Sequence, residues 1–440
     1  MSDQGRSGSR YKDHEVELRL AAERLLVRPG KSARHIDLAI TAPAASSGDT
    51  RSPLSLALVV DRSGSMQGSK LATAKAAAMA VLERLESEDH AAVVVFDSEV
   101  ETILAEGPMT KERKAKAKRR LAEVEARAST ALHQGWLTGC RAIAADTAGM
   151  VAQGQLSRCF LLTDGLANIG LDDPEAIAAQ AAEVRANTGI GTSTFGIGDD
   201  YDEGLLAPMA VAGSGQFHHL RDETDIAATF SGELAELFNV TARGVRVELE
   251  FDPSVQPELI SLYRSAQADS TTSMTVDVGD LIAGESRHLV LRLNVLGLAP
   301  GETAAIRARV VWRQGDSLMA AEWSEIRFTC ADHTTCDAEP RIMPVMHWVG
   351  LHHAERAKKH ALDLHRQGDG KLAIQALRAV MRRLREYAKP DQDLVRALDE
   401  LGKLRKRYEE GKMTRSEAKE QMFNYVSTSR MQRDLRSFHK

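Results

Sequence analysis

Apolar residues follow two different patterns along this chain. Residues 16–20 and 36–40 place apolar side chains at every second position, which is typical of strands with one buried face. The sequence therefore predicts strands within residues 14–45, followed by a polar linker around residues 42–53. Residues 1–13 are mostly polar, and we expect them to be disordered.

A different pattern begins at residue 54. Short apolar runs are separated by alanine-rich stretches of helical character; the runs are Leu54–Val60, Ala91–Phe96, Cys159–Leu162 and Thr192–Ile197. Strands without alternation are buried on both faces, and strands interleaved with helices favour a parallel sheet. The sequence predicts a doubly wound, mostly parallel α/β domain over residues 54–241.

Alternation returns after the α/β region, in residues 245–251, 274–278, 289–293 and 306–312. This is the pattern of an antiparallel β-sandwich. Because residues 14–45 share it, we predict that the α/β domain is inserted into one sandwich, whose remainder spans residues 243–330.

The last part of the chain, residues 341–440, is predicted to be a helical module. The expected helices cover residues 347–367, 371–388, 391–410 and 414–437. This part contains 23 Lys and Arg against 13 Asp and Glu, a balance of +10, whereas the preceding part carries −15. Two basic clusters are candidates for partner docking: Arg382, Arg383 and Arg385, and Arg405, Lys406 and Arg407. Alternatively, these charges only solubilise a module that braces the sandwich.

The composition argues against a membrane protein, a secreted protein and a disulfide-rich protein. The chain has 440 residues, of which 43% are hydrophobic and 27% charged, and it contains four cysteines. We find no run approaching the ~18 apolar residues of a membrane helix, and the N-terminal residues lack the apolar core of a signal peptide. So few cysteines do not indicate a disulfide framework. We therefore expect a cytoplasmic protein without a membrane partner.

Candidate chemistry follows the first buried strand. In "LALVVDRSGSMQGSK", the strand ends at Asp61, and Ser63 and Ser65 follow in the loop. One carboxylate and two hydroxyls favour a hard cation such as Mg²⁺. Ligands in open parallel sheets gather at the carboxyl ends of strands, and two more oxygen ligands are available there, Thr130 in "ASTALHQG" and Asp164 in "CFLLTDG". Alternatively, the serines only cap a helix.

Three short motifs carry a family resemblance. "DRSGSM", "STAL" and "LLTDG", in this order, resemble the von Willebrand factor type A (VWA) domain and its metal-ion-dependent adhesion site. "FGIGDDYDEGLLAPMA" is similar to the later part of bacterial members, so the resemblance covers about residues 54–239. It implies that all five positions bind Mg²⁺, with Mn²⁺ or Ca²⁺ as alternatives, and that one coordination position is left for a partner's Asp or Glu. The family often has glycines before the threonine, where this chain reads "ARAST".

A second acidic group and a basic run are weaker signals. Asp199, Asp200 and Asp202 follow another strand, so they either line the rim of the metal site or form a solvated loop. The run Lys111–Arg120 resembles a nucleic-acid patch, but nearby glutamates favour a solvated helix face.

These observations favour a non-enzymatic, Mg²⁺-dependent adaptor that captures an acidic residue of a partner protein. The resemblance also implies an AAA+ ATPase as one class of partner. One alternative is a metal-dependent hydrolase of phosphate esters, in which Asp61 and Asp164 activate a metal-bound water. Another is a nucleic-acid-associated scaffold that uses the basic helices, although these lack interleaved aromatic residues.

Overall fold

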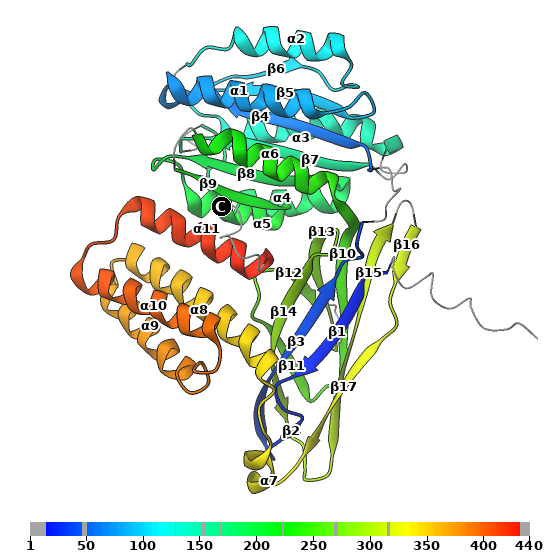
Figure 1. The fold of residues 1–440 in the computed structure, drawn as a ribbon, viewed down its shortest axis with the longest axis vertical. Helices are drawn as coiled ribbons and strands as arrows, with labels where there is room; N and C mark the ends of the chain where they lie inside the picture. The colour runs from blue at the N-terminus through cyan, green and yellow to red at the C-terminus, as the bar shows by residue number, and fades with distance from the viewer. Residues whose placement is uncertain are drawn as a thin grey trace, which may run out of the picture. The chain divides into compact units, whose positions relative to one another are not determined.

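The computed structural model describes residues 15–45, 51–127, 129–150, 155–166, 169–221, 224–267, 272–314 and 317–431. The chain divides into two compact units (Figure 1): residues 1–44, 241–313 and 318–440 form one, and residues 45–240 with 314–317 form the other. The predicted disorder of residues 1–13 lies outside the described residues, as does the end of the last predicted helix.

The second unit is built on a six-stranded sheet. Its strand order is β6 (Val100–Leu104), β5 (His90–Phe96), β4 (Leu54–Asp61), β7 (Leu156–Thr163), β8 (Gly191–Ile197) and β9 (Ser214–Leu220). All neighbouring strands are parallel except β5 and β6. Strands β4, β7 and β8 are buried along their whole length, which explains why their residues do not alternate.

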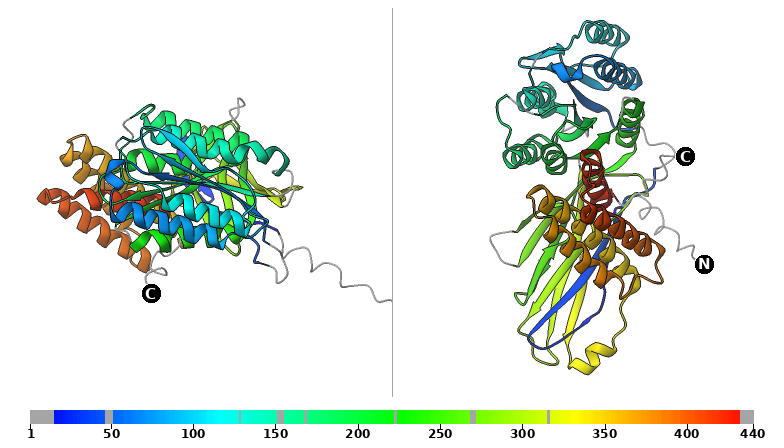
Figure 2. Two further views of the ribbon diagram at one scale, coloured as in Figure 1. Left: turned by 90° about the horizontal axis from the view of Figure 1, so that it is seen from above. Right: turned by 90° about the vertical axis from the view of Figure 1, so that its left-hand side faces the viewer.

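Helices cover both faces of this sheet. Those of the unit are α1 (Ser69–Arg84), α2 (Lys111–Ala122), α3 (Leu132–Met150), α4 (Pro174–Thr188), α5 (Glu203–Ala212) and α6 (Thr224–Phe238). Helices α1 and α6 lie on one face and α3, α4 and α5 on the other (Figure 2). The predicted doubly wound α/β fold is therefore confirmed.

The first unit contains two β-sheets that enclose an apolar core. One has the order β1 (Glu17–Ala22), β3 (Lys31–Thr41), β14 (Ser286–Leu296) and β11 (Val255–Leu259). The other has the order β12 (Arg264–Gln267), β13 (Ser273–Ile282), β10 (Val240–Phe251), β15 (Thr303–Gln314), β17 (Ser324–Cys330) and β2 (Leu26–Val27), and β16 (Ser317–Ala320) pairs with β15. In the first sheet, β3 is antiparallel to β1 and β14, and β14 is antiparallel to β11. In the second, the pairs β12–β13, β10–β15 and β15–β17 are antiparallel, whereas β17 and β2 are parallel.

Strand β3 is central to the first of these sheets. It pairs with β1 on one side and along its full length with β14 on the other. Segments on either side of the α/β region in sequence thus belong to one sandwich, and the predicted insertion is confirmed.

The C-terminal part is helical, as the sequence predicts. Its helices are α7 (His333–Ala338), α8 (Met343–Arg366), α9 (Gly370–Leu384), α10 (Gln392–Glu410) and α11 (Arg415–Met431). Helix α8 packs against the other three long helices and against β3 and β14. Val345, Met346 and Val349 of α8 share a buried cluster with Ile260 and Val290 of the sandwich. The module therefore braces the sandwich. No helix among the described residues is long and apolar enough to cross a membrane.

Candidate functional site

The candidate metal ligands lie where strands β4 and β7 end. Asp61 is the last residue of β4, and Asp164 directly follows β7, its parallel neighbour. Thr130 precedes helix α3. Asp61, Ser63 and Asp164 are completely buried and Thr130 is 3% exposed, whereas Ser65 is exposed. Among the five candidate ligands, Ser65 is therefore the one that is exposed to solvent.

The structure brings the five side chains together. Oγ of Ser65 donates a 2.7 Å hydrogen bond to Oδ1 of Asp164 and lies 3.1 Å from Oγ of Ser63. A Cβ atom on Gly165 would lie 3.5 Å from Oγ of Ser65, 3.6 Å from Oγ1 of Thr130 and 3.9 Å from Oδ2 of Asp61. Oxygen atoms from three separate loops therefore face one small region, which the missing side chain of Gly165 keeps open.

This donor set fits a small hard cation. Every donor is oxygen, two from carboxylates and three from hydroxyls, which matches the preference of Mg²⁺. With bonds of about 2.0–2.1 Å in an octahedron, neighbouring ligand oxygens lie about 3 Å apart. The spacings of 2.7 and 3.1 Å between the Ser65 hydroxyl and its neighbours are close to that value.

The capping alternative for the serines is not supported. Ser63 precedes a short 3₁₀ helix, η2 (Gly64–Met66), yet its side chain makes no capping hydrogen bond. Helix α1 begins after Gly68, which has no side chain to cap it.

Asp61 is held in place by its neighbours. The backbone N–H of Ser63 donates to its Oδ1 at 2.7 Å, and the hydroxyl of Thr163 donates to its Oδ2 at 2.5 Å. Burial raises the pKa of Asp61 to about 6, and the charge of Asp164 adds to this rise, while both hydrogen bonds oppose it. Sequence reasoning overlooked Thr163, although it stands beside Asp164 in the "LLTDG" motif.

Asp164 has a cationic neighbour that sequence reasoning also overlooked. Nζ of Lys70 lies 2.5 Å from Oδ2 of Asp164. The Asp164 side chain is completely buried, whereas that of Lys70 is 29% exposed. Lys70 therefore reaches from the surface of helix α1 into the site.

Hydrogen bonds fix the loops that carry the ligands. Nε of Arg62, next to Asp61, contacts Oδ2 of the buried Asp97 after β5 at 2.8 Å. The backbone N–H of Arg127 donates to the carbonyl of Arg62, and that of Ala131 donates to the carbonyl of Asp97. Arg127 and Ala131, on either side of Thr130, are thus bonded to the residues that follow two strands, which places Thr130 beside Asp61.

Two glycines let helix α3 approach the sheet. A Cβ atom on Gly135 would lie 2.6 Å from Cγ of Phe96, and one on Gly139 would lie 2.3 Å from Cγ2 of Val59. Real Cβ atoms do not come so close to other heavy atoms, so only glycine fits at these positions. The close packing fixes the start of α3 and hence the position of Thr130.

Of the three aspartates that follow β8, Asp202 caps a helix, whereas Asp199 and Asp200 are exposed. Asp202 is the N-cap of helix α5, where its side chain accepts a hydrogen bond from the backbone N–H of Gly204 at 2.7 Å. Asp199 and Asp200 are exposed in the loop. Their predicted place on the rim of the metal site stays a prediction.

The two basic clusters differ in their surroundings. Arg382, Arg383 and Arg385 are exposed near the end of α9, and the described residues include no ion pair of theirs. In the second cluster, Arg405, Lys406 and Arg407 pair with Glu409, Glu410 and Glu417. The α9 cluster is therefore the one whose charges are uncompensated within the described part of the chain.

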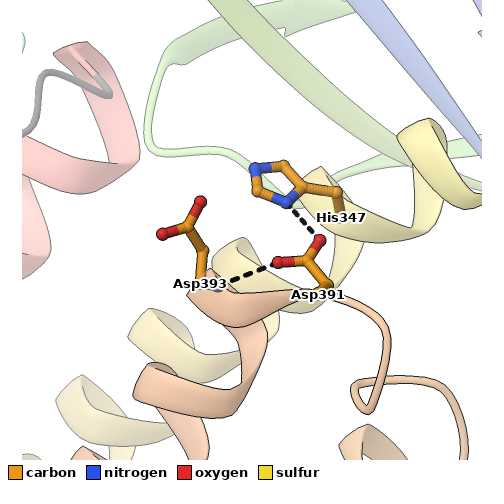
Figure 3. A group of neighbouring side chains, drawn as sticks. All are labelled: His347, Asp391 and Asp393. Carbon is orange, nitrogen blue, oxygen red and sulfur yellow. Dashed lines mark hydrogen bonds and ion pairs between the residues drawn. The ribbon is translucent and has the colours of Figure 1, made fainter.

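One further group of possible metal ligands occurs among the described residues: His347, Asp391 and Asp393 (Figure 3). Asp391 is the N-cap of α10 and accepts a hydrogen bond from the backbone N–H of Asp393 at 2.9 Å. Its other oxygen lies 2.6 Å from Nδ1 of His347. These bonds explain the group as a connection between α8 and α10.

Two uncharacterized proteins are similar to this chain in sequence. The chain is 27% identical to an uncharacterized protein of Synechocystis sp., over 66% of this chain and 68% of that protein. It is 25% identical to the uncharacterized protein YfbK of Escherichia coli over 55% of this chain, and spans only 42% of that relative.

Solved structures show the same fold over almost the whole chain. A von Willebrand factor type A protein from Catenulispora acidiphila aligns with a TM-score of 0.75 at 19% identity, covering 96% of this chain and 99% of that one. The ArnB paralog VWA2 from Sulfolobus acidocaldarius aligns with a TM-score of 0.60 at 15% identity, covering 94% and 98%. Residues 55–233 match the von Willebrand factor type A domain family, and this part of the chain is a VWA domain.

Proposed function

We propose that this protein is a non-enzymatic adaptor whose VWA domain binds Mg²⁺ and, through it, an Asp or Glu side chain of a partner protein. The observation that carries the proposal is that side-chain oxygens of Ser65, Thr130 and Asp61 lie beside Gly165, and that those of Ser63 and Asp164 lie within 3.1 Å of the Ser65 hydroxyl. Domains of this family commonly mediate protein–protein interactions and typically bind a divalent cation.

The proposed ligands are of two kinds, charged carboxylates and neutral hydroxyls. Asp61 and Asp164 supply two negative charges, and the hydroxyls of Ser63, Ser65 and Thr130 supply neutral oxygens. When bound, the ion supplies an electron-poor position that takes an anionic oxygen from outside. The exposure of Ser65, in contrast to the buried aspartates, supports entry of that oxygen from the Ser65 side.

Apolar side chains near the same loop support a protein as the ligand. Leu166, two residues after Asp164, is 55% exposed, and Ile169 is 38% exposed. Interfaces place apolar contacts around a few polar anchors. A carboxylate at the ion, surrounded by contacts to Leu166 and Ile169, would give such an interface.

Calorimetric titration with Mg²⁺ tests the metal site. The wild type should bind one ion, Asp61→Ala should abolish binding, and Asp172→Ala, which removes an exposed carboxylate outside the ligand set, should bind as the wild type does. Equal Mg²⁺ binding by the wild type and Asp61→Ala would overturn the proposed ligand set.

Capture from native lysate tests the adaptor role. A partner should be retained in Mg²⁺, released by EDTA, and absent with Asp61→Ala, while Asp172→Ala retains it. Capture that is unchanged in EDTA would contradict the proposal. If the protein hydrolyses a phosphate ester and this activity depends on Asp61, the protein is a hydrolase and the proposed adaptor function is wrong. An AAA+ ATPase as partner and a cytoplasmic location stay predictions.

A further inference from the structure

We infer that Lys70 competes with the metal ion for Asp164 and so sets the affinity of the site for Mg²⁺. This inference rests on the proposed function, because it concerns the regulation of the same site. Without a divalent cation, the Lys70 ammonium balances the negative charge of Asp164. When a divalent cation binds, it displaces the ammonium, and the Lys70 side chain moves to the exposed edge of the site.

The contact lies within the proposed ligand set. Nζ of Lys70 is 2.5 Å from Oδ2 of Asp164, and Oδ1 of the same carboxylate accepts the hydrogen bond from Ser65. Asp164 is completely buried, so its negative charge is not solvated by bulk water. An ion at this site would therefore share Asp164 with an ammonium that already occupies one of its two oxygens.

The position of Lys70 in its helix argues against a merely structural role. It is the second residue of α1, and the first turn of that helix contains no acidic residue. The N-terminus of a helix carries partial positive charge, which disfavours a cation. The helix thus gains nothing from an ammonium at this end, and the contact with Asp164 is what accounts for its placement.

The side chain is also able to leave. Lys70 is 29% exposed, which shows that part of it already contacts solvent. Lysine has a flexible four-carbon stem and a strongly hydrated ammonium. The Lys70 ammonium can therefore move into water when a divalent cation, with its larger positive charge, binds Asp164.

The first test measures Mg²⁺ affinity by calorimetry in the wild type, Lys70→Met and Lys70→Arg. Because coupling between two ligands is typically about 5- to 150-fold, Lys70→Met should bind Mg²⁺ at least about fivefold more tightly. Lys70→Arg keeps the positive charge and should stay close to the wild type. Unchanged or weaker binding by a folded Lys70→Met protein would overturn the inference, and Lys70→Gln serves the same purpose if the methionine variant does not fold.

The second test uses the wild-type protein and does not depend on a variant. Acetylation by an N-hydroxysuccinimide ester is measured for each lysine by mass spectrometry, with and without Mg²⁺. Lys70 should become more reactive when Mg²⁺ binds, whereas Lys75 of the same helix, whose ammonium contacts the carbonyls of Ala122 and Val124, should not change.

The outcomes separate the two proposals. Mg²⁺ binding by calorimetry with no change in Lys70 acetylation would overturn the competition while leaving the metal site intact. Absence of Mg²⁺ binding by the wild type and by Lys70→Met would overturn the proposed function itself.

Discussion

The hydroxyl of Thr163 donates a 2.5 Å hydrogen bond to Oδ2 of Asp61, and both side chains are completely buried. The bond orients the carboxylate toward the space shared with Ser65 and Thr130. Partners of this kind behind a metal ligand typically contribute 10- to 100-fold to metal affinity.

Removing this hydroxyl should therefore weaken the metal site. We expect Thr163→Val to lower Mg²⁺ affinity about 10- to 100-fold, while Thr163→Ser, which keeps the donor, stays near the wild type. Calorimetric titration measures both, with circular dichroism as a check on the fold. Wild-type affinity in Thr163→Val would mean that Asp61 does not need this bond.

Sequence reasoning located Asp61 and Asp164 because the apolar pattern marks the ends of their strands. Asp61 is the last residue of β4 and Asp164 directly follows β7, and parallel neighbours bring such positions to one edge of the sheet. Lys70 and Thr163 were overlooked because their roles depend on which way a side chain points. Nothing in the local spacing distinguishes the Lys70 contact with a residue 94 positions away.

Two strands of the six-stranded sheet, β6 and β9, were not predicted from the apolar runs, and their positions in the sheet explain why. Strand β6, "VETIL", lies at an edge of the sheet and is half exposed. Strand β9, "SGQFHHL", lies at the other edge and mixes polar and apolar residues, so it lacks the buried run that marks β4. By contrast, the main predicted helices α8–α10 agree closely with the observed ones, because Gly and Pro mark their ends.

A side chain at Gly139 should destabilise the packing of helix α3 on the sheet. A Cβ there would lie 2.3 Å from Cγ2 of Val59, and overpacking of this kind costs about 1–3 kcal/mol. We expect Gly139→Ala to lower the free energy of unfolding by that amount in denaturant titration. Gly232→Ala is the control, because a Cβ meets nothing within 4 Å at that position of α6. Equal stabilities of the two variants would contradict the packing argument.

Acidification should weaken the packing of α8 on the sandwich. His352 is buried against Ser261 and the carbonyl of His288, each 3.3 Å from its Nε2. Burial lowers the pKa of His352 to about 4, and the positive charge of Arg356 adds to this. The unfolded chain, with a histidine pKa of about 6.5, then binds more protons than the folded protein between pH 6.5 and 4.

Stability from this group is therefore complete above pH 6.5 and is lost as the pH falls toward 4, by about 3 kcal/mol in total. Unfolding titrations at several pH values between 7 and 4 measure the slope. His352→Gln has no titrating group at this position, so its slope should be smaller. A slope equal to that of the wild type would show that His352 is not responsible.

The N-terminal strands should be indispensable to the sandwich. Ile36, Leu38 and Ile40 of β3 are completely buried, and β3 supplies the partner for the whole of β14. Deleting residues 1–45 would expose the edge of β14 and its apolar face, and exposed edges favour aggregation. We expect aggregation by light scattering, whereas deletion of residues 1–13, which keeps β1 and β3, should give a protein that stays in solution. A truncation lacking residues 1–45 that is as stable as the full chain would refute this.

The exposed arginines of α9 give the clearest test of a docking role for the helical module. Arg382, Arg383 and Arg385 have no ion pairs within the described part of the chain, so changing all three to Glu breaks no internal contact that the structure shows. If this cluster attracts an acidic partner, the triple variant should capture less partner, and its capture should depend less on salt than that of the wild type.

The control for that variant is reversal of the second cluster, Arg405, Lys406 and Arg407. These residues pair with glutamates of α10 and α11, so reversal there should destabilise the helices as well as change surface charge. Thermal unfolding separates the two effects, because only the α9 variant should keep the wild-type transition. If the α9 variant is folded and captures partner with unchanged affinity and salt dependence, its arginines only solubilise the module, and the partner contacts the protein elsewhere.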